Sequence, residues 1–274
     1  MDLVAITDHD SIDGALELMH HLPASDDVIV GEEVSCWHGS IEVHLGVYGM
    51  TESLHRDIQP LRANAFDVIA CLRGQDVFFS LNHLLHFYRG QAPLQDYLRL
   101  LDEVPALEVR NGAMLPAHNL LIEHIASRWT SGNGRSRLGM IGGSDAHTLR
   151  RIGTTWTEAP GRNRQEFLEN LKRGRSQAGG AHGGAATVAG DTYGVIGSFM
   201  GSLLGAGPRD HAGWHRTACL AFAGLSLPFQ FLPMMIAAMG KVREAAAVGT
   251  VTEQLHSLLV EEADQPLEVE QVPF

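Results

Sequence analysis

The chain has 274 residues and a formal net charge of −12, with 32 acidic and 20 basic residues. That length can bury a full core, either as one barrel-sized α/β domain or as a domain with an appendage. The acidic balance and the lack of a basic stripe argue against strong binding of double-stranded nucleic acid. The three cysteines, Cys36, Cys71 and Cys219, are odd in number and scattered. Together with the lack of a signal-peptide pattern, they predict a cytoplasmic protein without disulfides.

Short apolar runs alternate with longer helix-like stretches over the first 175 residues. The strand-like runs are Leu3–Ile6, Val28–Val30, residues 41–49, residues 77–82, Ala106–Val109 and Leu138–Ile141. The helix-like stretches are Ile12–His21, Leu54–Arg73, Leu94–Leu101, His118–Trp129 and Arg164–Arg173. This alternation predicts parallel βα units. Histidines on the helix-like stretches, such as His55 and His118, are expected to be solvated.

Metal-competent side chains occur at or near the ends of these strand-like runs. They are Asp8 and His9, Glu32 and Glu33, His44, His83, and finally Asp145 and His147. In a β/α barrel the carboxyl ends of the strands converge on one mouth, where imidazole and carboxylate groups suit Zn²⁺, Mn²⁺ or Fe. The alternative for the first run is a polar turn, in which Asp10 or Ser11 caps a helix starting near Ile12.

Six short motifs in this order resemble the polymerase and histidinol phosphatase (PHP) superfamily. They are ITDHD, GEEVS, VHLGVYG, SLNHLL, EVRNG and GGSDAH, and the likeness covers residues 1–175. The resemblance implies a distorted, seven-stranded, TIM-like β/α barrel with up to three divalent metal ions, Mn, Zn or Fe. It also implies a metal-dependent phosphoesterase that hydrolyses small phosphorylated substrates with a metal-activated water. The most similar members act on nucleotides or short oligonucleotides.

The resemblance also implies roles for individual residues. One metal would be held by Glu33, His44 and His83. A second would share Glu33 and use Asp145, and a third would use His9 and His147. Asp8 would orient His9, while Arg89 and Arg110 would bind the substrate phosphate or simply be surface residues.

The first strand of the family, with its His-x-His pair, has no counterpart in this sequence. We therefore expect a barrel without its first βα unit. Either the true start lies upstream of Met1, or the chain is a truncated and catalytically impaired form. In the second case the alternative function is a PHP-like binding or regulatory module.

The sequence beyond Arg175 differs in character from the first 175 residues. Residues 176–191 are rich in Gly and Ala and are predicted to be a linker, followed by an apolar helical region at 192–245 and an acidic segment at 246–274. The last 14 residues, 261–274, are expected to be disordered. Residues 192–208 and 217–240 contain no charged side chain. We expect residues 192–240 to form two helices that contact a membrane, a second copy of the chain or each other.

Overall fold

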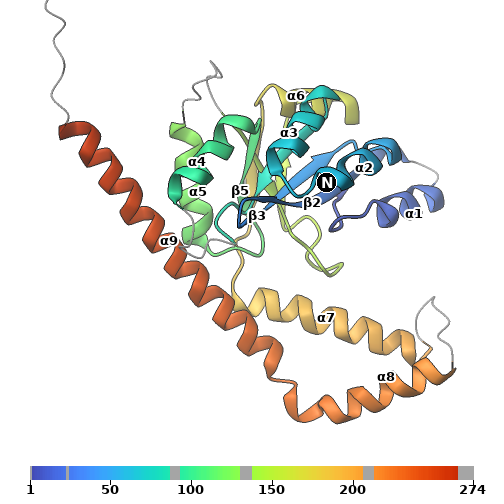
Figure 1. Cartoon of the computed structure of the whole chain (residues 1–274). Coiled ribbons are helices and arrows are strands. Elements are labelled where there is room, and N and C mark those ends of the chain that lie inside the picture. Colours follow the sequence, from blue (N-terminus) through green and yellow to red (C-terminus); the bar gives the residue numbers. More distant parts are fainter. Residues whose placement is uncertain (1, 23–24, 87–92, 130–137, 206–212, 265–274) are drawn as a thin grey trace, which may run out of the picture.

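The computed structural model describes residues 2–22, 25–86, 93–129, 138–205 and 213–264. It shows a mixed α/β protein whose main sheet curls into part of a barrel, with an arm of helices beside it (Figure 1). The partial TIM-like barrel predicted from the sequence is confirmed at this level of detail.

The main sheet has six strands in chain order. They are β1 (Val4–Ile6), β2 (Val28–His38), β3 (Ile41–Tyr48), β4 (Phe78–Asn82), β5 (Ala106–Asn111) and β6 (Gly139–Gly143). A separate antiparallel pair is formed by β7 (Thr155–Glu158) and β8 (Gln177–Gly180). The helices of this part are α1 (Asp13–His21), α2 (Glu52–Ile58), α3 (Ala65–Gly74), α4 (Leu94–Glu103), α5 (Pro116–Arg128) and α6 (Arg164–Lys172).

The strand directions depart from the predicted parallel ladder. β1 pairs with β2 in parallel, and so do β4 with β5 and β5 with β6, but β3 is antiparallel to both β2 and β4. The reason is a tight connection: His38 pairs with Ile41, which leaves only Gly39 and Ser40 between β2 and β3. Gly39 has a φ of 60°, the left-handed conformation that two-residue hairpin turns favour. The prediction of parallel βα units is therefore wrong for β2–β4.

The predicted helix Leu54–Arg73 is divided into α2, a short 3₁₀ turn (Gln59–Leu61) and α3. Thr51 caps α2 through a hydrogen bond that Leu54 N donates to Thr51 Oγ1 over 3.2 Å. Asn64 caps α3 in the same way, accepting from Phe66 N over 3.1 Å. Pro60 and the second cap between them end one helix and start the next.

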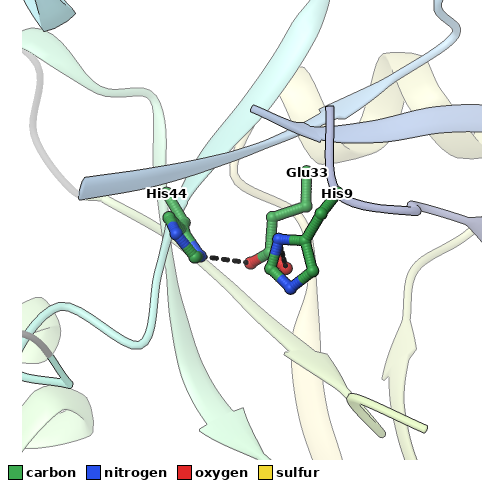
Figure 2. A group of neighbouring side chains, drawn as sticks. All are labelled: His9, Glu33 and His44. Atoms are coloured by element: carbon green, nitrogen blue, oxygen red, sulfur yellow. Dashed lines mark ion pairs between the residues drawn. The ribbon is translucent and has the colours of Figure 1, made fainter. Parts of the chain in front are cut away.

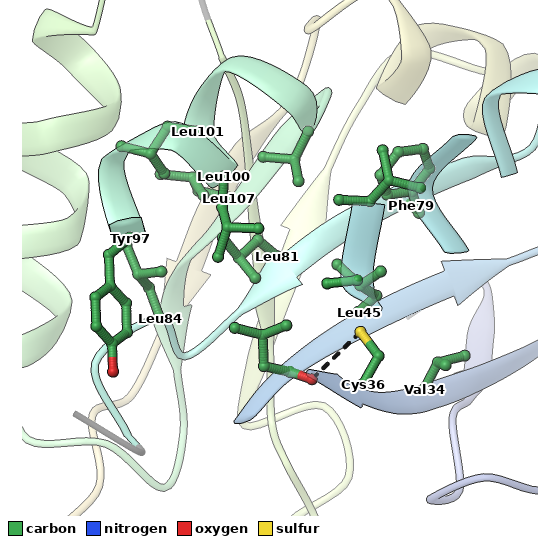
Figure 3. Packing of buried hydrophobic residues seen from close by; sticks show 14 of the residues in the cluster. Val34, Cys36, Leu45, Phe79, Leu81, Leu84, Tyr97, Leu100, Leu101 and Leu107 are labelled. Carbon is green, nitrogen blue, oxygen red and sulfur yellow. Dashed lines mark hydrogen bonds between the residues drawn. The ribbon is translucent and has the colours of Figure 1, made fainter. Parts of the chain in front are cut away.

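The hydrophobic core lies on one face of the sheet, against α2–α5. Val34, Leu45, Leu81 and Leu107 point into it from four neighbouring strands (Figure 3). Successive strand residues face opposite sides, so the residues next to these four face away from this core. Those neighbours include Glu33, His44 and Asn82.

The arm consists of α7 (Ala185–Leu203), α8 (Gly213–Ser226), a 3₁₀ turn (Leu227–Phe229) and α9 (Leu232–Asp264). α7 and α9 pack against each other, and α9 continues along α5 (Figure 1). Ala247 and Val251 of α9 belong to the core of the barrel. Within the described residues no single helix has the length and apolar content to cross a membrane. The pair Gly213–Phe229 and Leu232–Ser257, bent by 60°, meets both criteria together.

Three expectations for this part need adjustment. The predicted linker, residues 176–191, contains β8 and the first turns of α7. Residues 246–264 continue α9, so the segment Glu261–Asp264, expected to be disordered, is helical, and residues 265–274 lie outside the described part. The two helices expected over 192–240 are the end of α7, all of α8 and the start of α9.

Candidate metal centre

The two adjacent glutamates of the GEEVS motif face opposite sides of β2. Glu32 points towards α2, where its Oε2 lies 2.7 Å from His55 Nδ1 and its Oε1 accepts a hydrogen bond from Gln59 Nε2 over 3.2 Å. His55 is therefore engaged with a buried carboxylate and is not simply solvated, as the sequence suggested. Glu33 points to the other side, towards a cavity, so only one of the two carboxylates belongs to the candidate site.

The Glu33 carboxylate is surrounded by three imidazoles. Its Oε2 lies 3.4 Å from His9 Nδ1, while its Oε1 lies 3.4 Å from His44 Nδ1 and 2.9 Å from His83 Nε2. Figure 2 shows the side chains of His9 and His44 directed at this carboxylate.

The register of the strands brings these side chains together. His9 forms a parallel bridge with Glu33, supported by a hydrogen bond from Asp10 N to Glu33 O over 3.0 Å. His44 pairs with Asn82 across β3 and β4, and His83 follows directly at the end of β4.

His9, Glu33 and His44 each offer one ligand atom, and these atoms lie within 4.8 Å of one another. Two imidazole nitrogens and one carboxylate oxygen form a donor set that fits Zn²⁺, Mn²⁺ or Fe. Glu33 and His44 are buried, whereas the side chain of His9 is 53% exposed. The group is therefore rigid on one side and open to water or substrate on the other.

The electrostatics of the group keep the carboxylate charged. Burial raises the pKa of Glu33, but hydrogen bonds with His44 and His83 outweigh it and hold this pKa well below 4.5. Burial lowers the pKa of His83, but its bond to Glu33 and the charges of Glu33, Glu108 and Asp145 raise it to about 9. Glu33 and His83 therefore form a buried ion pair beside the candidate ligand atoms.

Asn82 positions the Glu33 carboxylate. Its Nδ2 donates to Glu33 Oε1 over 3.0 Å, and its Oδ1 accepts from Ser80 Oγ over 2.7 Å. A Cβ at Gly46 on the adjacent strand would come within 2.9 Å of the Asn82 amide. The glycine of the VHLGVYG motif therefore makes room for this amide.

Glu108 is a buried carboxylate that the sequence analysis did not single out. Its Oε2 accepts hydrogen bonds from His83 N over 3.1 Å and from Asn111 Nδ2 over 3.0 Å. Burial raises the pKa of Glu108 to about 7, although His83 and Asn111 lower it in part. The sequence signal was an acidic residue inside an apolar strand. In the structure, Gly143 of the neighbouring strand leaves room for this carboxylate, because a Cβ there would lie 2.8 Å from Glu108 Oε1.

Asp145 and His147 line the same cavity but are not part of the group of three ligand atoms. Asp145 Oδ1 lies 3.8 Å from His147 Nδ1, and Asn111 Nδ2 donates to Asp145 Oδ2 over 3.4 Å. The pairings of His9 with His147 and of Glu33 with Asp145 stay predictions, since the structure groups His9 with Glu33 and His44 instead.

The three residues predicted to assist catalysis have different positions. Asp8 lies beside the first turn of α1, where a Cβ at Gly14 would be 2.3 Å from Asp8 Oδ2. Arg110 donates to Gly180 O over 3.2 Å and lies 3.4 Å from Glu123 Oε2, and the described lining of the cavity does not include it. Arg89 lies outside the described residues. Their roles therefore stay predictions.

Several residues that follow strands of the main sheet have a left-handed backbone. Among the described non-glycine residues, positive φ angles occur at Asp10 (53°), Asp76 (51°), His83 (27°) and Asp145 (46°). All but Asp76 follow strands of the main sheet. Asp10 does not cap α1: its Oδ1 accepts from Ser35 N over 2.8 Å, and Arg62 Nη2 donates to its Oδ2 over 2.5 Å.

The cavity itself has a volume of about 2050 Å³ and extends between β1 and β7. Its polar lining includes Asp8, His9, Glu33, Asn82, Glu108 and Asp145. Trp156 of β7 also lines it, with 42% of its surface exposed. His9 and Glu33 thus face a space much larger than a single ion needs.

Comparison with known proteins gives a match to one family model and distant likenesses to solved structures, among them the two below. Residues 134–176 match the family model PHP_C, described as PHP-associated. A protein from Bifidobacterium adolescentis, named as a metal-dependent phosphoesterase, is 16% identical with a TM-score of 0.41, over 63% of this chain and 86% of its own. The lesion-specific endonuclease EndoQ from Pyrococcus furiosus has the same identity and TM-score, 16% and 0.41, over 65% of this chain and 49% of its own. No curated protein matches the sequence.

Proposed function

We propose that the chain is a member of the PHP superfamily and a metal-dependent hydrolase of phosphate esters. The observation that carries the proposal is the buried Glu33 carboxylate, which stays ionised between the imidazoles of His9, His44 and His83. A buried carboxylate among histidines at strand ends is the arrangement expected of a metal centre.

His9, Glu33 and His44 would hold the ion, which we propose to be Mn, Zn or Fe. Such an ion, when bound, polarises a phosphoryl oxygen and lowers the pKa of bound water, so that hydroxide is available near neutral pH. His83 and Asn82 orient Glu33 through hydrogen bonds of 2.9 and 3.0 Å. Because an imidazole must be neutral to bind a metal, His9 and His44 have to be deprotonated in the active form.

We further propose a nucleotide or a short oligonucleotide as substrate. The cavity of about 2050 Å³ exceeds the range of about 300–1,000 Å³ that small ligands usually occupy. Trp156 offers an aromatic surface on which a base can stack. Arg162, exposed and on the cavity lining, is a cation available to the phosphate, whereas Arg110 is engaged with Gly180 and Glu123.

The two adjacent glutamates of β2 allow a matched test. Glu33→Gln and Glu32→Gln make the same chemical change at buried positions on opposite faces of one strand. We expect Glu33→Gln to lose bound metal and to reduce hydrolysis of bis(p-nitrophenyl) phosphate by roughly 100-fold. Glu32→Gln should keep the metal, because its carboxylate contacts His55 and Gln59 instead.

Metal content by elemental analysis and steady-state rates on mononucleotides and short oligonucleotides decide between the outcomes. Full metal content in Glu33→Gln would place the ion elsewhere and refute the site. Metal bound at Glu33 without hydrolysis of any phosphate ester would refute the enzyme and support the PHP-like binding module.

A further inference from the structure

The outer end of the arm exposes apolar side chains to solvent. We call residues 213–243 the arm tip; they comprise α8, the 3₁₀ turn Leu227–Phe229 and the start of α9. Figure 1 shows α8 at the end of the arm away from the barrel. The large exposed side chains of the tip are Trp214, Phe222, Leu225, Leu227, Phe229, Phe231, Met234, Met235, Ile236, Met239 and Val242. So many neighbouring apolar groups mark an interaction surface.

α8 exposes large apolar side chains together with a cation. Its partly buried residues are His215, Cys219, Leu220, Ala223 and Ser226, and Cys219 Sγ lies 3.7 Å from His215 Nε2. Trp214, Phe222 and Leu225 are 77%, 73% and 77% exposed, and Arg216 is exposed beside them. The helix thus presents large apolar side chains to its surroundings, as interfacial helices do towards lipid.

The charges of the arm tip all have one sign. No charged residue occurs from Thr217 to Gly240, and the tip contains Arg216, Lys241 and Arg243 but no aspartate or glutamate. Arg216 and Arg243 are exposed, whereas Lys241 is paired with Glu244. This local positive charge contrasts with the net charge of −12 of the whole chain.

The sign of these charges discriminates between the two kinds of partner. In a two-fold contact between two arm tips, the same cations would meet without an acidic residue of the tip to pair with. An anionic lipid surface supplies both the apolar layer for Trp214 and Phe222 and the negative charge for Arg216 and Arg243. We propose that the arm tip binds the surface of an anionic bilayer and inserts its apolar side chains among the lipids.

Vesicle co-sedimentation of the full-length chain tests this proposal. One set of vesicles contains phosphatidylcholine alone, and the other contains phosphatidylcholine mixed with phosphatidylglycerol. We expect binding to the anionic vesicles to be at least roughly tenfold stronger and to weaken with added salt. The double substitution Phe222→Glu and Phe229→Glu should abolish binding.

Two further variants separate the apolar and charged contributions. Arg216→Glu with Arg243→Glu keeps every apolar group and should reduce binding to anionic vesicles by roughly tenfold or more. Leu120→Glu on α5 is the control, since Leu120 is also exposed (57%) but lies outside the arm. It should bind like the unmodified protein.

Three outcomes would overturn the proposal. The first is no binding to either vesicle, and the second is equal binding to both. The third is a stable dimer in sedimentation analysis that Phe222→Glu with Phe229→Glu dissociates while vesicle binding stays absent, which would identify a second copy as the partner.

Discussion

The barrel buries its apolar side chains whereas the arm tip exposes them, and α9 extends through both parts. In the barrel, Leu45 and Leu81 point into the core while the residues beside them, such as His44 and Asn82, face away from it. In the arm tip most of the large apolar side chains are exposed. On α9, Val242 is 70% exposed and Val251 is fully buried. One continuous helix therefore has an end that stabilises the fold and an end available to a partner.

The largest expected difference in stability is between the same substitution made at Val251 and at Val242. Val251→Asp places a carboxylate in the core and should lower the free energy of unfolding by about 3–5 kcal/mol. Val242→Asp changes an exposed position and should stay within about 0.5 kcal/mol. Urea denaturation of both variants measures the difference. Similar effects at both positions would show that α9 does not pack on the barrel as described.

The next effect concerns the contact that fastens α9 to the barrel. Glu244 is buried; its Oε1 accepts from Leu115 N over 2.7 Å, and its Oε2 accepts from Lys241 Nζ over 2.5 Å. Glu244→Ala leaves both donors without this acceptor, so we expect a loss of about 2–3 kcal/mol in denaturation experiments. Glu253→Ala, on an exposed position of the same helix, should have little effect. Equal stability of the two variants would contradict the contact.

A third prediction uses the buried histidine of α5. Burial lowers the pKa of His118 to about 3, with His83 adding to the shift, against an ordinary value of 6.5. Below pH 6.5 the His118 imidazole is protonated in the unfolded chain but stays neutral in the folded chain. The free energy of unfolding is therefore unaffected by His118 above pH 6.5 and decreases as the pH drops towards 3. Between pH 7 and pH 5 this amounts to up to about 2 kcal/mol.

His118→Gln should remove this part of the acid sensitivity, as measured by denaturation at a series of pH values. His124→Gln, at an exposed position of the same helix, should leave the slope unchanged. A slope unaffected by His118→Gln would mean that this imidazole is not buried in its neutral form.

The smallest effect is expected where α7 meets the loop after β6. Asp191 accepts from Thr148 Oγ1 over 2.7 Å and lies 3.5 Å from Arg151 Nη1, while Arg151 Nη2 donates to Ser144 O over 2.7 Å. Asp191→Asn keeps the acceptor for Thr148 but removes the charge facing Arg151. We expect a loss of about 1 kcal/mol, seen as a lower melting temperature. An unchanged melting temperature would show that the ion pair contributes nothing.

The sequence predicts where the strands lie better than it predicts their directions. Each apolar run named from the sequence overlaps a strand, because buried strands read as apolar segments. β2, however, extends from Val28 to His38, well past the apolar run Val28–Val30. Gly39 and Ser40 are residues that favour a turn, but Glu32 and Glu33 hide the fact that β2 is a buried strand that continues up to this turn. The hairpin between β2 and β3 was therefore not predicted.

The composition of the candidate site depends on contacts that the sequence does not contain. Glu33, His44 and His83 were expected together, and all three meet in the structure. His9 joins Glu33 because β1 and β2 lie side by side in a particular register, which no local pattern encodes. His118 was expected to be solvated because it falls on a helix-like stretch. It is buried because packing from other parts of the chain covers its face of α5.

The left-handed backbone at His83 and Asp145 limits how the thermal stability of the protein can be raised by mutation. Each such residue strains the chain by roughly 1–2 kcal/mol relative to glycine, because of its Cβ. Selection for heat resistance alone would therefore favour glycine at both positions. The change at His83 would remove an imidazole that contacts Glu33, and the change at Asp145 would remove a carboxylate that lines the cavity. Stabilising substitutions should be sought elsewhere in the chain, because at these two positions a gain in thermal stability would remove a functional side chain.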